Sequence, residues 1–217
     1  MKIGAGLLRW IYPPRCPFCR KIVRSENTQC EECAAKNPLA EPHFYLQLRQ
    51  RKRAIESAAA YLYRDAVREA IGRMKFRGKQ HLALYFAEKL VQTMRNHGMT
   101  EFDSVTYVPM TRRSLADRGY NQAEEIARKV AKQFGRPCEK LLQKTKENQP
   151  QHNLTTPQKR IENVRGVYAP AKRAQIAGKK ILLVDDVITT GATMLSCANE
   201  LYKAGAKEVI CVAAAKA

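Results

Sequence analysis

Residues 181–194 have the sequence ILLVDDVITTGATM, and this stretch decides the fold. Its first four residues are all apolar, so the run is too short for a helix and lacks the polar alternation of a strand with one face in water. Such a run is typical of a strand buried on both faces, as in a parallel sheet covered by helices. The sequence therefore predicts an open α/β sheet, with Asp185 and Asp186 placed where this strand leaves it.

The residues after the two acids are small and rich in hydroxyl groups. Residues 189–193, TTGAT, lead into a predicted helix that runs to Ala204 and that Gly205 can end. Ligands of open α/β sheets lie beyond the carboxyl ends of the strands, and a helix N-terminus offers free N–H groups to a phosphate. The stretch thus predicts a site in which the two acids bind the hydroxyl groups of a polyol and the helix N-terminus binds a phosphate. The alternative is an ordinary strand-to-helix turn, whereas a P-loop is disfavoured because its lysine is missing.

The order and spacing of these residues resemble the phosphoribosyl pyrophosphate (PRPP) loop of type I phosphoribosyltransferases. The resemblance implies that Asp185 and Asp186 accept hydrogen bonds from the ribose hydroxyl groups, directly or through a Mg²⁺ ion, while residues 189–193 hold the 5′-phosphate. Purine-salvage members of that superfamily carry an acid at the position of Thr189, and a threonine cannot act as a general base there. We therefore do not expect ordinary purine salvage. The residues expected to bind PRPP at this loop are Asp185, Asp186, Val187, Thr189, Thr190, Gly191, Ala192 and Thr193.

A second candidate phosphate-binding segment follows another predicted buried strand, residues 104–108. We expect a loop over residues 110–120, whose guanidinium and N–H groups suit a pyrophosphate. Type I phosphoribosyltransferases keep their pyrophosphate loop at this place, so the resemblance assigns the pyrophosphate to Thr111, Arg112, Arg113 and Arg118. Asn121 and Glu124 predict a capping box for a helix that ends before Gly135.

A long polar stretch, residues 143–156, follows a predicted short strand at 139–142. A stretch of this length without periodicity is typical of a functional lid, and a short helix is expected after it at 157–163. Lys144 and Lys146 are expected to close over the site, neutralise the leaving charge and exclude water. Together with Asp185 and Asp186 they are the candidate catalytic residues.

The chain has seven cysteines, four of which form two CxxC pairs separated by a short loop. Two such pairs can place four thiolates in a tetrahedron around Zn²⁺. A redox CxxC would not need the second pair, and a double disulfide would need an oxidising compartment. A structural zinc site is therefore predicted at Cys16, Cys19, Cys30 and Cys33.

The chain of 217 residues carries a formal net charge of +19, which favours a polyanionic partner over a merely basic surface. Tyr120 and Phe76 lie among cations and are expected either to stack on bases or to be buried. No apolar run approaches the about 20 residues of a membrane span, and the start of the chain does not resemble a signal peptide, so a cytosolic protein is expected. The candidate nucleic-acid contacts are Arg51, Lys52, Arg53, Lys75, Arg77 and Lys79.

The predicted organisation is a small zinc-binding module with a linker, residues 1–50, followed by a phosphoribosyltransferase-like domain, residues 51–217. The linker is assigned to residues 34–50, where prolines interrupt the sequence and apolar periodicity is absent. The other expected elements are a strand at 58–63, a helix from Asp65 with Val67, Ala70, Ile71 and Met74 in the core, a helix at 80–96, a return to the sheet at 167–168 and a last strand at 207–213.

Several motifs occur in the order found in one family: the two CxxC pairs, KFRGK at 75–79, VPMTRRSLADRGYNQAEEIA at 108–127, the stretch 151–163 and VDDVITTGAT at 184–193. Over nearly its whole length the chain resembles the ComF family of competence-associated proteins. The resemblance implies a zinc module joined to a phosphoribosyltransferase-like domain, and a role in handling imported single-stranded DNA during natural transformation.

Three classes of function compete. The protein is expected to bind PRPP and act on single-stranded DNA in the cytosol, together with other DNA-uptake proteins. The alternative is an active phosphoribosyltransferase with a small-molecule or nucleobase acceptor, unrelated to DNA. A DNA-binding adaptor with a vestigial fold is disfavoured, because the acid pair and the phosphate loop are both intact.

Overall fold

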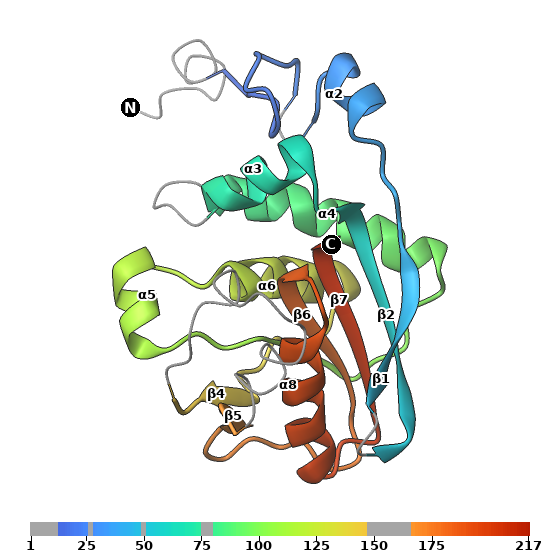
Figure 1. Cartoon of the computed structure of the whole chain (residues 1–217), viewed down its shortest axis with the longest axis vertical. Helices are drawn as coiled ribbons and strands as arrows, with labels where there is room; N and C mark the ends of the chain where they lie inside the picture. The colour runs from blue at the N-terminus through green and yellow to red at the C-terminus, as the bar shows by residue number, and fades with distance from the viewer. Residues whose placement is uncertain (1–12, 26–27, 49–50, 75–79, 147–165) are drawn as a thin grey trace.

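A computed structural model describes residues 13–25, 28–48, 51–74, 80–146 and 166–217. Its centre is a five-stranded sheet with the strand order β1-β2-β7-β6-β3 (Figure 1). β1 runs antiparallel to β2, and the other neighbours are parallel. The predicted open, mostly parallel sheet is therefore confirmed. Its strands are β1 (His43–Leu48), β2 (Arg53–Leu62), β3 (Ser104–Tyr107), β6 (Lys180–Ile188) and β7 (Glu208–Lys216).

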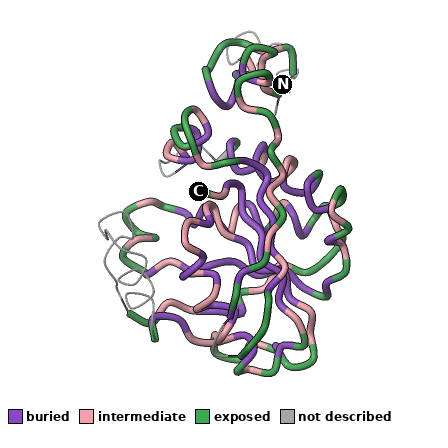
Figure 2. Tube along the Cα trace, turned by 45° about the vertical axis from the view of Figure 1, so that its right-hand side comes forward, coloured by how far each residue is buried: buried purple, intermediate pink, exposed green. Residues whose placement is uncertain are grey.

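Helices cover both faces of this sheet. α4 and α6 pack on one face with α3 beside them, and α8 packs on the other face next to a two-stranded sheet of β4 and β5. Figure 2 shows the strands running through the buried centre of the molecule. The remaining elements are α2 (Glu31–Lys36), α3 (Asp65–Met74), α4 (Gln80–Asn96), α5 (Arg112–Arg118), α6 (Gln122–Phe134), α8 (Ala192–Lys203), β4 (Leu142–Lys144) and β5 (Tyr168–Pro170).

The apolar run that opens β6 supplies two separate cores. Leu182 and Val184 belong to the core under α4 and α6, whereas Ile181 and Leu183 belong to the core under α8. All of these side chains are buried, as expected for a strand that has apolar neighbours on both faces.

The helices that were predicted from periodicity are present. In α3 the buried residues are Val67, Ala70, Ile71 and Met74, as predicted, and α4 spans the predicted range. Gly205 ends α8: its N–H bonds Tyr202 O at 3.1 Å, and the next N–H, of Ala206, bonds Leu201 O at 3.0 Å.

The capping box of α6 is only half formed. Asn121 caps the helix by accepting a hydrogen bond from Ala123 N at 3.0 Å, and Gly135 ends it. Glu124 pairs with Arg128 at 2.6 Å and does not return to the cap, because a guanidinium one turn away offers a charged partner.

The linker prediction is wrong for two segments. Glu31–Lys36 extends past residue 34 as a helix, and His43–Leu48 is a strand that pairs with β2 over its whole length. The strand is short and lies at the edge of the sheet: Phe44, Leu46 and Leu48 face one core, Phe44 is only half-buried, and the residues that alternate with them are exposed. A division of the chain at Pro42, in place of residue 50, is our proposal.

Two smaller strand predictions also need correction. The strand predicted at 139–142 is found at Leu142–Lys144, and Tyr168–Pro170 pairs with it in the separate small sheet, so this segment does not return to the main sheet. Each of these strands is three residues long, and backbone hydrogen bonds from Thr145 N to Val167 O and from Ala171 N to Leu141 O flank the pair. Within the described ranges, no helix is long and apolar enough to span a membrane.

Candidate functional site

The two acids lie at the carboxyl end of the sheet, beside the point where one neighbouring strand stops. β3 pairs with β6 as far as Tyr107 and Val184, and β6 then continues along β7 alone as far as Ile188. The prediction that the strand leaves the sheet at the acids is therefore wrong. The strand continues past them along β7 and loses only its neighbour β3 at this point. Asp185 and Asp186 are half-buried in this position, and Asp186 N donates to Asp185 Oδ1 at 2.8 Å. The bond fixes one carboxylate against the backbone of the strand.

The loop after β6 delivers the chain to the N-terminus of α8. Gly191 is the N-cap, with a φ of 76°, and it provides no side chain to cap the first amide groups of the helix. Thr190 Oγ1 accepts a weak bond from Ala192 N at 3.4 Å. The first turn of α8 thus presents backbone N–H groups and the positive end of the helix dipole next to the two acids.

Leu46 of β1 lies against this loop. A Cβ built on Gly191 would lie 2.5 Å from Leu46 Cδ2, so a larger residue would have to displace the end of the Leu46 side chain, and the positive φ itself favours glycine. The edge strand that was mistaken for a linker therefore contacts the loop between β6 and α8.

A tyrosine on β5 contacts Thr193 of the same stretch, and no motif in the sequence pointed to it. The buried Tyr168 hydroxyl hydrogen-bonds the side chain of Thr193. Burial raises the pKa of Tyr168, and the nearby groups Cys197 and Asp185 raise it further. Lys144 Nζ lies 6.0 Å from the centre of the Tyr168 ring, which places this predicted catalytic lysine next to the loop.

Tyr63 was also missed. It follows β2 at the carboxyl end of the sheet, where its N–H bonds Lys216 O at 2.7 Å. Burial raises the pKa of Tyr63, and the charge of Asp186 raises it further, whereas Arg68 lowers it. Arg68 lies over the Tyr63 ring at 5.7 Å from the ring centre, so a cation on α3 stands near the second acid.

The predicted pyrophosphate loop contains a helix, so the loop prediction is wrong in its local structure. α5 begins at Thr111, whose hydroxyl accepts a bond from Ser114 N at 3.1 Å, and ends at Gly119. None of its residues is buried, and even Leu115 is 42% exposed, so the apolar periodicity that reveals most helices is absent. Figure 1 shows α5 at the edge of the molecule opposite β1.

The arginines of α5 follow the carboxyl end of β3, the strand next to β6. Neighbouring parallel strands end at the same edge of a sheet, so α5 extends from the edge that carries the acids. Arg112 and Arg113 are exposed and have no ion-pair or hydrogen-bond partner among the described residues. Arg118 Nη1 donates to Gln122 Oε1 at 3.4 Å. As far as the described residues show, these two guanidinium groups are available to an anion.

The residues that follow α5 anchor it to the rest of the protein. Asn121 Nδ2 donates to Val108 O at 3.0 Å, and this bond joins the two ends of the segment that carries α5. The Tyr120 hydroxyl and Gln122 Nε2 both donate to Met74 O at the end of α3, the second at 3.3 Å. Tyr120 is buried by this contact, so of the two expectations for it, burial is correct and base stacking is wrong.

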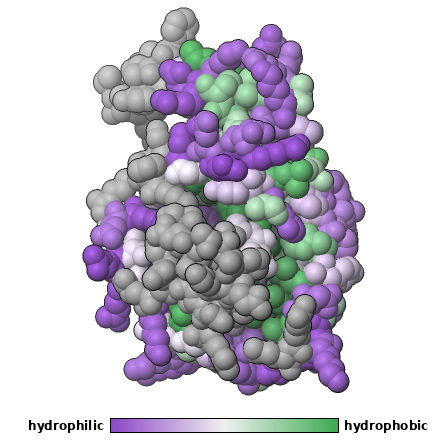
Figure 3. Space-filling model, in the orientation of Figure 1, coloured by the Kyte–Doolittle hydropathy of each residue, from purple (hydrophilic) through white to green (hydrophobic). Residues whose placement is uncertain are grey.

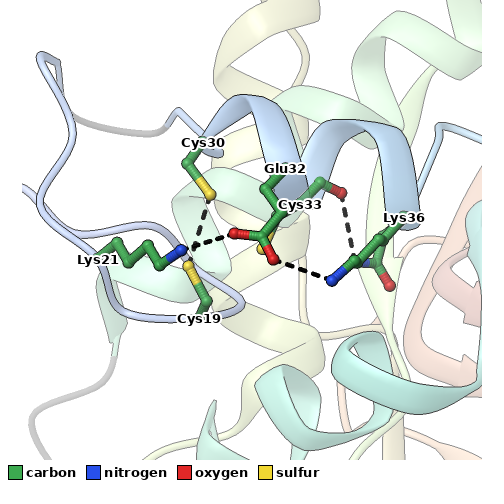
Figure 4. A network of polar contacts seen from close by, with 7 residues as sticks. Cys19, Lys21, Cys30, Glu32, Cys33 and Lys36 are labelled. Carbon is green, nitrogen blue, oxygen red and sulfur yellow. Dashed lines mark hydrogen bonds and ion pairs between the residues drawn. The ribbon is translucent and has the colours of Figure 1, made fainter.

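The four predicted zinc ligands come together. The Sγ atoms of Cys16, Cys19, Cys30 and Cys33 all lie within 4.8 Å of one another, and those of Cys19 and Cys30 are 3.5 Å apart. A tetrahedral Zn²⁺ with bonds of about 2.3 Å requires sulfur atoms about 3.8 Å apart, so the donor set fits this ion. We call the segment that carries Cys16 and Cys19 the first knuckle. Figure 4 shows the sulfurs of Cys19, Cys30 and Cys33 between this knuckle and α2.

Charged side chains next to the sulfurs tie the two knuckles together. Glu32 on α2 binds Lys21 of the first knuckle at 2.6 Å and Lys36 at 2.9 Å (Figure 4). These three side chains are largely exposed, so the pairs contribute little stability. The metal itself would hold this module together.

The zinc module packs directly on the main domain. Phe18, in the first knuckle, makes edge-to-face contacts with Tyr61 and Tyr85 at 5.8 and 5.7 Å between ring centres. Tyr85 also donates to Gln29 Oε1 at 2.6 Å. Cys16, Phe18 and Cys33 belong to the same core as α3 and α4, so the module and the domain share a core.

The described members of the nucleic-acid set lie at the amino end of β2, the opposite end of the sheet from the acids. Arg51 Nε bonds Asn199 Oδ1 at 3.1 Å, and Arg53 lies 5.0 Å from the centre of the Tyr202 ring. Lys52, Arg53 and Lys207 line an open groove of about 590 Å³ together with Tyr45, which is 56% exposed, and with the carboxylates Glu56 and Glu208.

Some predicted residues have no described position or no described contact. Lys146 is exposed, and nothing brings it to the acids. Residues 147–165, which include most of the predicted lid, the motif at 151–163 and the helix at 157–163, lie outside the described residues. So do Lys75, Phe76, Arg77 and Lys79 of the KFRGK motif.

Comparison with known proteins finds matches to both the zinc module and the main domain. Residues 7–44 match the family model of a double zinc ribbon domain, and residues 114–217 match that of a phosphoribosyl transferase domain. Competence protein ComFC of Streptococcus pneumoniae is 28% identical over 198 residues, which cover 89% of this chain and 77% of the relative. Competence protein F of Haemophilus influenzae is 24% identical over 200 residues, which cover 89% and 86%. The chain is a homologue of the ComF competence proteins.

The resemblance to the ComF family is thus confirmed, as are the phosphoribosyltransferase-like fold and the four-cysteine zinc ribbon. DNA utilization protein YhgH of Salmonella typhimurium is another relative of this ComF homologue, 25% identical over 203 residues that cover 89% of the chain and 86% of the relative. Among solved structures, the glutamine PRPP amidotransferase of B. subtilis aligns with a TM-score of 0.40 and 25% identity, over 60% of this chain and 26% of that one.

Proposed function

We propose that the protein binds PRPP at the carboxyl end of the sheet and acts in DNA uptake. The observation that carries the proposal is the acid pair Asp185–Asp186, which stands where β3 leaves β6, directly before the N-terminus of α8. The acids suit the ribose hydroxyl groups, and the first amides of α8 with the threonines around them suit the 5′-phosphate. Arg112, Arg113 and Arg118 are the candidate partners of the pyrophosphate.

A Mg²⁺ ion fits this arrangement. It prefers carboxylate, phosphate and water oxygens, and the half-buried Asp185 and Asp186 offer carboxylates beside the expected pyrophosphate. Bound with PRPP, the ion would neutralise part of the pyrophosphate charge. The protein's own share is to orient the ribose through the acids and the phosphate through the loop that Gly191 and Leu46 shape.

The DNA-uptake role is supported by the relatives, which are named as competence and DNA utilization proteins. The formal net charge of +19 supports an anionic partner, and we propose single-stranded DNA in the cytosol, with other DNA-uptake proteins nearby. Lys52 and Arg53 at the groove, and Arg51 next to them in the chain, are the described candidates for contact with it.

Phosphoribosyl transfer to a small-molecule or nucleobase acceptor is the second candidate. Lys144 favours it, because this lysine places a cation over the Tyr168 ring beside the candidate PRPP loop, where it can offset negative charge on the bound substrate. Measurement of pyrophosphate release with nucleobases and with DNA ends distinguishes the two candidates: release with any acceptor supports transfer, and none across the series supports binding alone.

The test of PRPP binding is calorimetry with Mg²⁺ on the double variant Asp185→Asn, Asp186→Asn. We expect PRPP binding to be lost, by about 100-fold or more, because the ribose and the metal lose their anionic partners. The control is Glu101→Gln with Asp103→Asn, two exposed carboxylates before the amino end of β3, which removes the same formal charge from a protein that already attracts anions. Wild-type affinity in the double aspartate variant would sink the assignment.

A further inference from the structure

The zinc module is attached to α3 through an arginine at the end of that helix. The Arg73 guanidinium donates to the backbone oxygens of Pro17 and Phe18 in the first knuckle, the second at 3.0 Å. Its side chain is only 24% exposed, and its nearest carboxylate, Glu69, lies 3.9 Å away. The Arg73 guanidinium therefore binds the backbone of the first knuckle and is not an exposed surface cation.

Met74, the next residue of α3, connects this helix to the residues that follow α5. The carbonyl of Met74 is at the C-terminus of the helix, where carbonyls lack helical partners. It accepts hydrogen bonds from the Tyr120 hydroxyl and from Gln122 Nε2, and Gln122 in turn accepts from Arg118 of α5. A continuous series of contacts thus runs from the backbone of the zinc knuckle to an arginine of the candidate pyrophosphate helix.

α5 depends on such anchors for its position, because it buries no side chain of its own. A surface helix of this length is not stable in isolation, so the place of its arginines is set by the segments at its two ends. At one end the chain leaves β3, and at the other Tyr120, Asn121 and Gln122 bind Met74 O and Val108 O.

The geometry points to Arg73 and Tyr120 as positioning residues through which the folded zinc knuckle sets the place of α5, so that an intact knuckle strengthens binding of the pyrophosphate end of PRPP. The inference rests on the proposed PRPP site and adds the zinc module to it. Zinc bound by the four cysteines would hold the loop whose carbonyls accept from Arg73, and Arg73 connects that loop to the end of α3.

The first test compares two ligands by calorimetry with Mg²⁺ in Arg73→Ala and Tyr120→Phe. Both variants are expected to keep about one zinc per chain and to bind PRPP about tenfold more weakly, while ribose 5-phosphate, which lacks the pyrophosphate, changes by less than about twofold. The control is Arg128→Ala on α6, whose guanidinium pairs with Glu124 of the same helix at 2.6 Å and should leave both affinities unchanged. Equal loss for the two ligands, or no loss for either, overturns the inference.

A second measurement does not need PRPP binding. Trypsin cleavage after Arg112, Arg113 and Arg118, followed by mass spectrometry, reports how well α5 is held. We expect cleavage there to be several-fold faster in both variants, and in wild-type protein after zinc removal, than in Arg128→Ala. If wild-type protein fails to bind PRPP, the proposed function fails while this result still tests the connection. Unchanged cleavage in both variants overturns it.

Discussion

At the scale of single residues, Gly191 is the position where the candidate site tolerates least change. Its φ of 76° is unfavourable for any residue with a Cβ, and an added Cβ would lie 2.5 Å from Leu46 Cδ2. We expect Gly191→Ala to lower the free energy of unfolding by about 2 kcal/mol or more, because backbone strain and overpacking add. Urea denaturation measures the loss, and PRPP affinity should fall with it.

Gly178 offers a matched control for this prediction. It has the same φ of 76°, but nothing lies within 4 Å of an added Cβ. Gly178→Ala should therefore cost only the backbone term, about 1 kcal/mol. Leu46→Ala should relieve part of the Gly191→Ala penalty in the double variant. Equal losses at the two glycines would show that Leu46 yields freely and does not fix the loop.

At the scale of elements, the zinc module should fold only with its metal. Metal analysis of purified protein should give about one zinc per chain, and Cys16→Ser should remove it, because three thiolates no longer close the tetrahedron. Cys16 also lies in the core shared with α3 and α4, so loss of zinc should lower the melting temperature of the whole chain. The control is Cys138→Ser, a half-buried cysteine away from the cluster. Zinc retained in Cys16→Ser would contradict the assignment.

The elements also show how far local sequence determines structure. β6, α6 and α8 could be predicted because their apolar spacing, caps and glycines lie within a few residues of one another. β1 could not, because it is a short edge strand in which Leu46 and Leu48 are buried and Phe44 is only half-buried against the core. α5 could not either, since it has no buried face and is defined by its two ends.

The same distinction holds within the candidate site. Asp185, Asp186 and the four cysteines follow from motif spacing alone, because their geometry is set by short segments. Tyr63 and Tyr168 carry no motif and reach the acids and the loop only through pairing of distant strands. Met74 is the extreme case, because its backbone oxygen, and not its side chain, anchors α5.

At the scale of the whole molecule, the candidate PRPP and DNA sites lie at opposite ends of the sheet. The acids follow the carboxyl end of β6, whereas Lys52 and Arg53 precede or begin β2. Figure 3 shows hydrophilic residues over much of the visible surface, from the zinc module to the opposite end of the molecule. With a formal net charge of +19, DNA binding could therefore be spread over the surface or concentrated at the groove of Tyr45, Lys52, Arg53 and Lys207.

Salt dependence separates these two possibilities. Affinity for an oligothymidylate should fall steeply with salt, since each phosphate contact on a single strand adds about 0.7 to the slope of log affinity against log salt. If the groove binds the strand, Lys52→Ala with Lys207→Ala should reduce that slope by about 1.4, while Lys132→Ala with Lys140→Ala, two exposed lysines outside the groove, should leave it unchanged. Equal reductions in the two pairs would place the contacts over the whole basic surface. A wild-type affinity that does not respond to salt would show that charge does not drive DNA binding at all.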